Sequence, residues 1–213
     1  MTSRAAVTIP VLHHVNLKTH RLQEMIEWYS LVVGMEVTHQ FPGGAWLTND
    51  GANHRLALLA DPDWPDDPDK LQHTGLHHTA FEFASMDDLL DAYVRLASVG
   101  VVPHGCLDHG MTMSFYYVDP DGNSVELQCD EFGDWARSSD FIRNSPDFAA
   151  NPIGAPVDPA GLVAARDAGA TASELHQRAY AGEFTPAVPL DLRLPVPGPP
   201  AEDRGTGTLQ ASR

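Results

Sequence analysis

Two pairs of adjacent histidines stand out among the eleven histidines of this 213-residue chain. His13-His14 lies in the run VLHHVNL, and His77-His78 lies in LHHTAFEF. Both runs are rich in β-branched, aromatic and other apolar residues, which predicts two β-strands. Imidazole is a common metal ligand and changes charge near neutral pH. The pairs therefore point to metal binding or to proton transfer.

The alternation of a strand decides which histidine of each pair can enter a shared site. Successive side chains point to opposite faces, so both members of a pair cannot face the same cavity. His13 and His77 share the parity of the apolar residues in their runs, and we expect them to pack against a helix. This leaves His14 and His78 on the other faces, where they can meet.

A carboxylate is predicted to join them from the segment SFYYVDPDGNSVELQ. Asp119 to Gly122 has the residues of a tight turn, and the strand after it carries Glu126 on the face opposite Val125 and Leu127. Two histidines and one carboxylate form the ligand set of non-haem Fe(II) oxygenases. The predicted metal ligands are His14, His78 and Glu126.

The elements that position these residues form an internal repeat. Leu12-His13-His14 returns as Leu76-His77-His78, an offset of 76 − 12 = 64 residues. An amphipathic helix follows each copy, at 22–33 and 86–99, and Gly34 and Gly100 stand just beyond the helix ends. Three short strands follow each helix, expected at 36–40, 45–49, 54–59, 101–106, 111–118 and 124–129. We predict an α+β fold of two βαβββ modules, at about 10–60 and 74–129, within a catalytic domain spanning 8–130.

The remaining residues, 131–213, are predicted to be a C-terminal extension. One helix is expected over about 159–181, with Asp158 as N-cap and Pro159 in its first turn. The proline-rich tail from about residue 195 is expected to be disordered. Trp135 and Phe141 are candidates to anchor the extension, which would cover the cavity or mediate assembly.

Composition excludes several classes of function. The formal net charge is −16, which argues against nucleic acid and anionic membranes as partners. No apolar run approaches the roughly 20 residues that cross a bilayer, and the N-terminus lacks a signal peptide. Cys106 and Cys129 make no disulfide framework, which favours a cytoplasmic location.

Four motifs together resemble the type I extradiol dioxygenases of the vicinal oxygen chelate (glyoxalase–bleomycin-resistance–dioxygenase) superfamily. They are HHVNL, NHRLAL, HHTAFEF and SFYYVDPDGNSVE, and they are closest to the single-domain 2,3-dihydroxybiphenyl-cleaving branch. The resemblance implies a half-open barrel with Fe(II), or alternatively Mn(II), held by the three predicted ligands. It also implies that His54 is the acid–base histidine and that Tyr116 is the active-site tyrosine. His109 lies where related enzymes place a further histidine beside the substrate, although its loop is shorter here.

The implied reaction is extradiol ring cleavage of a catechol by O2. Apolar residues of the C-terminal tail, which we expect to be exposed, favour a homo-oligomer. A glyoxalase-type isomerase or epimerase is the first alternative, and it would need a fourth ligand from the first module. The equivalent position is 126 − 64 = 62, which is Pro62, with Asp61 and Asp63 beside it. A metal-free antibiotic-binding protein of the same fold is the second alternative, and it would not need the three ligands together.

Overall fold

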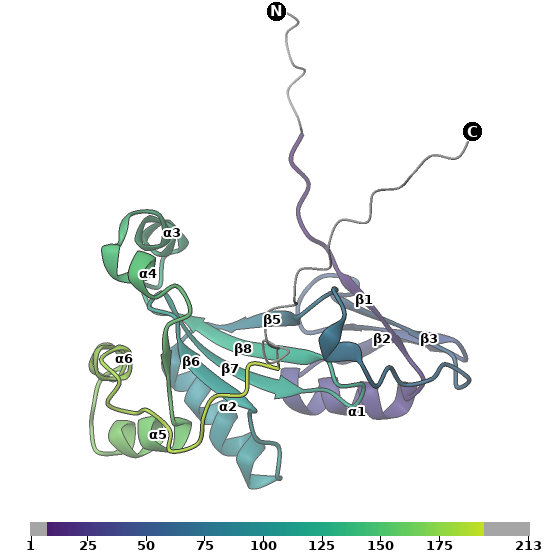
Figure 1. The fold of residues 1–213 in the computed structure, drawn as a ribbon. Coiled ribbons are helices and arrows are strands. Elements are labelled where there is room, and N and C mark those ends of the chain that lie inside the picture. Colours follow the sequence, from purple (N-terminus) through teal and green to yellow (C-terminus); the bar gives the residue numbers. More distant parts are fainter. Residues whose placement is uncertain (1–7, 194–213) are drawn as a thin grey trace, which may run out of the picture.

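The computed structural model describes residues 8–193, which form two β-sheets with helices packed against them (Figure 1). The strand order is β1-β4-β3-β2 in the first sheet and β5-β8-β7-β6-β9 in the second. The first sheet contains residues of the first predicted module only, and the second sheet contains the other module with one added strand. The α+β fold of two βαβββ modules is therefore confirmed. No helix in the described part of the chain is long and apolar enough to span a membrane.

The first module begins with a strand, continues through a helix and ends with three strands. In its sheet β1 pairs in parallel with β4, whereas β3 pairs antiparallel with both β4 and β2. The helix ends where Gly34 adopts a left-handed φ of 73°, as its place in the sequence predicts. The elements are β1 (Val15–Thr19), α1 (Leu22–Val33), β2 (Glu36–Phe41), β3 (Gly44–Thr48) and β4 (Leu56–Ala60).

The second module repeats this arrangement after the short 3-10 helix η1 (Lys70–Gln72). Ser85 caps its helix by accepting a hydrogen bond from the Asp88 backbone N–H. The turn between its last two strands contains Gly122 with φ 79°. The elements are β5 (His78–Phe83), α2 (Met86–Ser98), β6 (Gly105–Asp108), β7 (Thr112–Val118) and β8 (Ser124–Asp130).

Up to residue 193, the C-terminal extension adds a strand and four helices to the second module. Strand β9 (Ala155–Pro156) pairs with β6 and extends the second sheet. The single helix expected over about 159–181 is two helices, because the chain turns at residues 168–171 and Thr171 starts a new capping box. The expected tail from about residue 195 lies outside the described residues. The helices are α3 (Trp135–Asn144), α4 (Pro146–Ala150), α5 (Pro159–Asp167) and α6 (Ala172–Tyr180).

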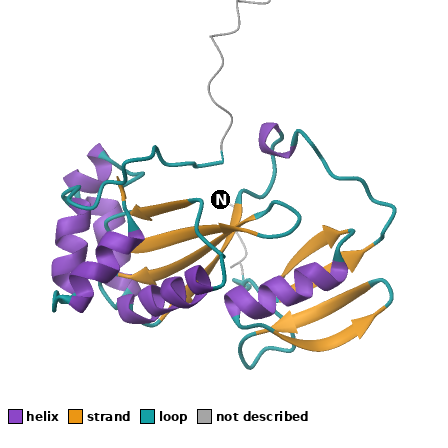
Figure 2. Ribbon diagram, turned by 90° about the horizontal axis from the view of Figure 1, so that it is seen from below, coloured by secondary structure: helices purple, strands orange, loops and turns teal. Residues whose placement is uncertain are grey.

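The two modules meet through their helices and cores. Helices α1 and α2 cover the same side of the molecule, below the sheets in Figure 1 and in front of them in Figure 2. Val32 of α1 is buried within the core of the second module, and Val125 of β8 is buried within the core of the first. The buried Tyr29 hydroxyl of α1 donates a hydrogen bond of 3.1 Å to Asp119, in the turn before β8. The junction thus combines apolar packing with a buried polar contact.

Candidate active site

The register of the second sheet gathers three of the predicted residues on one face. Glu126 of β8 lies opposite Ala80 of the parallel strand β5 and opposite Tyr116 of the antiparallel strand β7. His78 comes two residues before Ala80 in β5, so it faces the same side of the sheet. Tyr117, the neighbour of Tyr116, points into the core as its parity predicts, and it is fully buried. The alternation argument is confirmed in the middle of these strands.

These side chains form a continuous hydrogen-bonded chain. His78 Nε2 lies 3.0 Å from Glu126 Oε2, and the Tyr116 hydroxyl donates to Glu126 Oε1 at 2.9 Å. His109 Nε2 lies 2.8 Å from the Tyr116 hydroxyl oxygen. Since the single phenol proton is directed at Glu126, His109 must donate to Tyr116, which assigns a proton to its Nε2 atom.

His109 is held by the turn that connects β6 to β7. In this turn Gly110 has φ 85°, and its backbone N–H donates to Asp108 Oδ1 at 2.8 Å. The Asp108 side chain is fully buried and also accepts a hydrogen bond of 2.8 Å from Nδ1 of His176 in α6. The C-terminal extension therefore supports the segment that carries His109.

Burial and neighbouring charges set the protonation of these hydrogen-bonded side chains. Burial alone would raise the pKa of Glu126, but its hydrogen bond with His78 and other polar contacts outweigh burial and lower the pKa. Burial lowers the pKa of His109, in spite of the opposing effect of the Glu126 charge. Burial and the Glu126 charge raise the pKa of Tyr116 well above its ordinary value. At neutral pH Glu126 is therefore a carboxylate, His109 a neutral imidazole and Tyr116 a neutral phenol.

An open cavity of about 520 Å³ lies over these residues. One wall comes from α3 of the extension, where Trp135 and Ile142 line the cavity. The Trp135 indole N–H donates to Glu82 Oε1 at 3.1 Å, although 72% of the residue remains exposed. A larger cavity of about 650 Å³ lies elsewhere, between Trp64 and Arg193. Two of its carboxylates, Asp66 and Asp121, are paired with Arg21 at 2.6 and 2.9 Å.

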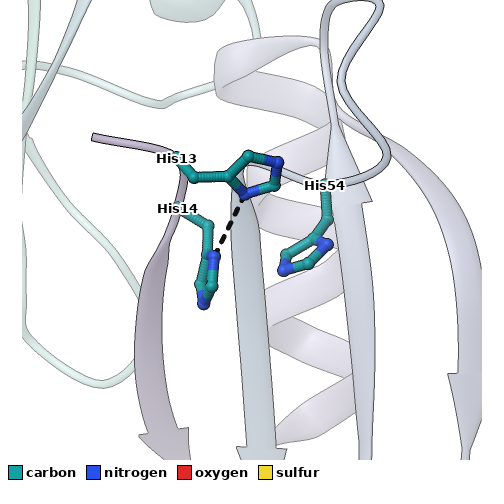
Figure 3. Close-up of side chains that lie close together, drawn as sticks. All are labelled: His13, His14 and His54. Atoms are coloured by element: carbon teal, nitrogen blue, oxygen red, sulfur yellow. Dashed lines mark hydrogen bonds between the residues drawn. The ribbon is translucent and has the colours of Figure 1, made fainter. Parts of the chain in front are cut away.

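The structure places His14 and His54 together in the first module (Figure 3). Their ring centroids are 4.4 Å apart, and the ring of His54 stacks on Trp46 of β3. His13 joins them, with its Nδ1 atom 3.2 Å from Nδ1 of His14. The prediction that His13 and His77 pack against a helix is wrong. Both are exposed, because the strands begin at Val15 and His78 and the alternation does not extend to the preceding residues.

The predicted ligands thus lie in two groups. Glu126 and His78 belong to the second module, whereas His14 lies with His13 and His54. Within residues 8–193, two groups of His, Cys, Asp or Glu residues could hold a metal ion, because at least three of their ligand atoms lie within 4.8 Å of one another. These groups are His13–His14–His54 and His20–Asp66–Asp121. Imidazole and carboxylate are nevertheless the donors that Fe(II) takes in non-haem sites. A divalent cation beside Glu126 would also compensate a carboxylate that is only 5% exposed.

Sequence reasoning missed the polar cluster behind His109. Asp108, His176 and the buried Glu131 lie together, with His176 Nδ1 3.8 Å from Glu131 Oε2. Asp108 and His176 are 68 residues apart, and neither has a local motif around it. The only signal was an isolated histidine in the apolar–polar pattern of the extension, which does not identify its partner.

Comparison with known proteins identifies the family to which this part of the chain belongs. Residues 11–127 match the family model described as Glyoxalase/Bleomycin resistance protein/Dioxygenase superfamily. The chain belongs to this superfamily.

Two similar proteins come from Rhodococcus globerulus. Biphenyl-2,3-diol 1,2-dioxygenase 2 is 38% identical over 180 residues, which cover 84% of this chain and 94% of that protein. Biphenyl-2,3-diol 1,2-dioxygenase 3 is 40% identical over 173 residues, which cover 81% of this chain and 90% of that protein. A solved glyoxalase/bleomycin resistance protein/dioxygenase from Nocardioides is 23% identical, with a TM-score of 0.47, over 59% of this chain and 87% of that one. Both dioxygenases are thus matched along at least 90% of their length.

Proposed function

We propose that this chain is an extradiol dioxygenase that opens the ring of a catechol of the 2,3-dihydroxybiphenyl type with Fe(II) and O2. The observation that carries the proposal is the hydrogen-bonded chain His78–Glu126–Tyr116–His109 on the floor of an open cavity. The two biphenyl-2,3-diol dioxygenases of similar sequence support the same reaction and the same substrate class.

His78, Glu126 and His14 would hold the iron, with Mn(II) as the alternative metal. When bound, the metal supplies chelation of the two catechol oxygens and activation of O2. Three protein ligands leave three octahedral positions for these groups. His14 lies immediately before β1 and is exposed, so its approach to His78 and Glu126 is part of the proposal.

The residues around the metal ligands would handle the protons. Tyr116 remains protonated because its pKa is raised, so its hydroxyl, which donates to Glu126 here, could turn to donate a hydrogen bond to a deprotonated catechol oxygen when Glu126 holds the metal. His109 sits behind Tyr116 and holds that hydroxyl in place. Burial lowers the pKa of His54, so it is neutral and can accept or return a proton. In the product the carbon–carbon bond beside the diol is broken and both atoms of O2 are retained.

The wall formed by α3 suits a hydrophobic substituent on the ring. Trp135 and Ile142 present apolar surface to the cavity and would contact the second ring of a dihydroxybiphenyl. The four-ligand isomerase is less well supported. Pro62 stands in the loop after β4, and neither Asp61 nor Asp63 belongs to a potential ligand set within the described residues. A small aromatic diol, O2, a cytoplasmic location and a homo-oligomeric state complete the proposal.

The direct test is anaerobic reconstitution with Fe(II), followed by 2,3-dihydroxybiphenyl and air. We expect a yellow ring-cleavage product and one O2 consumed per substrate, and a parallel sample with Mn(II) identifies the preferred metal. Glu126→Gln should abolish turnover, whereas Tyr117→Phe, on the opposite face of β7, should retain it. An absence of O2 uptake with a range of catechols, despite bound iron, would refute the proposal.

A further inference from the structure

Three histidines of the first module lie together at the entrance to its sheet. His13 and His14 directly precede β1, and His54 closely precedes β4. Because β1 and β4 are parallel neighbours, with Val15 opposite Leu56, the segments before them lie side by side. Figure 3 shows the three rings next to one another. The cluster is thus a product of the fold and not of sequence adjacency alone.

The spacing of the ring nitrogens suits a tetrahedral metal ion. Nδ1 of His13 lies 3.2 Å from Nδ1 of His14, and one ring nitrogen from each of the three histidines lies within 4.8 Å of the other two. Zinc binds imidazole at about 2.0–2.1 Å, which places two tetrahedral ligand nitrogens about 3.3 Å apart. Small ring rotations would bring His54 to the same spacing.

The backbone beneath the cluster is held in place. Arg55 donates from its guanidinium to the His13 carbonyl at 3.0 Å, and its own carbonyl accepts from the Val15 N–H at 3.0 Å. Arg55 is in turn paired with Asp50 at 2.8 Å. These contacts join the two segments that carry the histidines, while the rings of His13 and His14 remain exposed to solvent. The cluster is accessible to an ion and partly preorganised for it.

We propose that His13, His14 and His54 form a second metal site that takes Zn²⁺ and inhibits the enzyme. Three imidazoles with a water as fourth ligand make a set typical of zinc. The inhibition rests on the proposed function, because the site takes one iron ligand, His14, and the proton-transfer residue His54. Zinc binding itself does not depend on that function. His13 has no role in the proposed reaction, so a substitution at His13 tests the zinc site without removing an iron ligand.

The binding test is calorimetric titration of the iron-free full chain with Zn²⁺, with Co²⁺ as a spectroscopic probe of coordination. We expect the intense visible absorption of tetrahedral Co²⁺ and a fall in Zn²⁺ affinity of at least about tenfold in His13→Ala, since loss of a direct ligand should cost no less than loss of an outer contact. The matched control is His39→Ala, an exposed histidine of the same sheet whose ring centroid is 5.3 Å from that of Trp46. Its affinity should be unchanged. Equal Zn²⁺ affinity in His13→Ala and the wild type would overturn the site.

The inhibition test uses iron-loaded protein and 2,3-dihydroxybiphenyl. Zn²⁺ should inhibit the wild type and His39→Ala, whereas His13→Ala should turn over normally and require at least about tenfold more Zn²⁺ for the same inhibition. Equal sensitivity of His13→Ala would contradict the inhibitory role. If the wild type has no turnover, the proposed function fails, and the titration still decides whether the zinc site exists.

Discussion

At the scale of single residues, the hydroxyl of Tyr116 is the group that links the proposed metal ligand Glu126 to His109. It donates to Glu126 and accepts from His109, and it borders the cavity. In Tyr116→Phe we expect turnover to fall about 100-fold or more, because the hydrogen bond to the developing catecholate is lost. Iron content should be unchanged. Steady-state kinetics and metal analysis measure both, with Tyr117→Phe as the control for a tyrosine of the same strand.

His14 and His54 lie close together and should nevertheless behave differently. His54→Ala should keep iron but lose about 100-fold or more in turnover, because a proton-transfer group is removed. His14→Ala should lose iron, since a proposed ligand is absent. Metal content after gel filtration, compared with the rate under saturating Fe(II), separates the two effects. Full activity in His54→Ala would show that the acid–base assignment is wrong.

The residue scale also shows where prediction from sequence succeeded. The faces of Tyr116, Tyr117 and Glu126 follow from alternation because these residues lie within regular strands. His13 and His14 precede their strand, where no ladder of hydrogen bonds fixes the alternation. Their rings can therefore approach each other, which the strand argument had excluded.

At the scale of elements, α6 binds the end of β6 through a buried titratable cluster. Burial alone would lower the pKa of His176, but Asp108 and Glu131 outweigh it and raise the pKa above 6.5. Burial raises the pKa of Glu131 to about 8, from an ordinary value of 4.5. Both groups hold protons more tightly in the folded chain than in the unfolded chain. The free energy of unfolding that they contribute must therefore fall as the pH rises.

We expect this loss to begin near pH 4.5, the ordinary pKa of Glu131, and to include the contribution of His176 above about pH 6.5. The stabilisation from His176 is complete below its unfolded pKa and disappears through its folded pKa, while Glu131 ionises near 8 in the folded chain. The test is urea unfolding at pH 6 and pH 8.5 of the wild type and His176→Gln. The wild type should exceed the variant by more at pH 6 than at pH 8.5. An equal or larger difference at pH 8.5 would exclude this role for His176.

The extension is the element that sequence predicted least well. Its capping residues were identified correctly, since Asp158 accepts from the Ala160 N–H at the start of α5. Its second helix and its pairing with β6 were not predicted. The contacts that fix them, Asp108 with His176 and β6 with β9, join segments that are distant in the sequence. Local patterns fix where a helix starts, but they do not fix where the extension returns to the sheet.

At the scale of the whole molecule, the two modules are joined by contacts that one substitution can probe. Asp119 is buried and accepts from Asn123 as well as from Tyr29 of the other module. Tyr29→Phe should lower the free energy of unfolding by about 1.5 kcal/mol, because a hydrogen bond to a charged group is lost while other partners remain.

Tyr117→Phe is the matched control for this prediction. Tyr117 is equally buried, and its hydroxyl has no hydrogen-bond partner within residues 8–193. Removing that hydroxyl should leave stability unchanged or raise it. Urea unfolding of both variants provides the measurement, and equal losses in the two would show that the contact between the modules contributes nothing.

The short strand β9 has a consequence for the solubility of this protein. An unpaired outer strand is a template for pairing with another chain. In the second sheet β9 covers part of β6, whereas β2, at the outer edge of the first sheet, is exposed along its whole length. That edge is irregular, since its register with β3 shifts between Val37 and His39. The edge of the second sheet is thus protected by β9 of the extension, and the edge of the first sheet is protected by the irregular register of β2. A shortened protein ending near residue 145 lacks β9, so we expect it to aggregate through the exposed edge of β6.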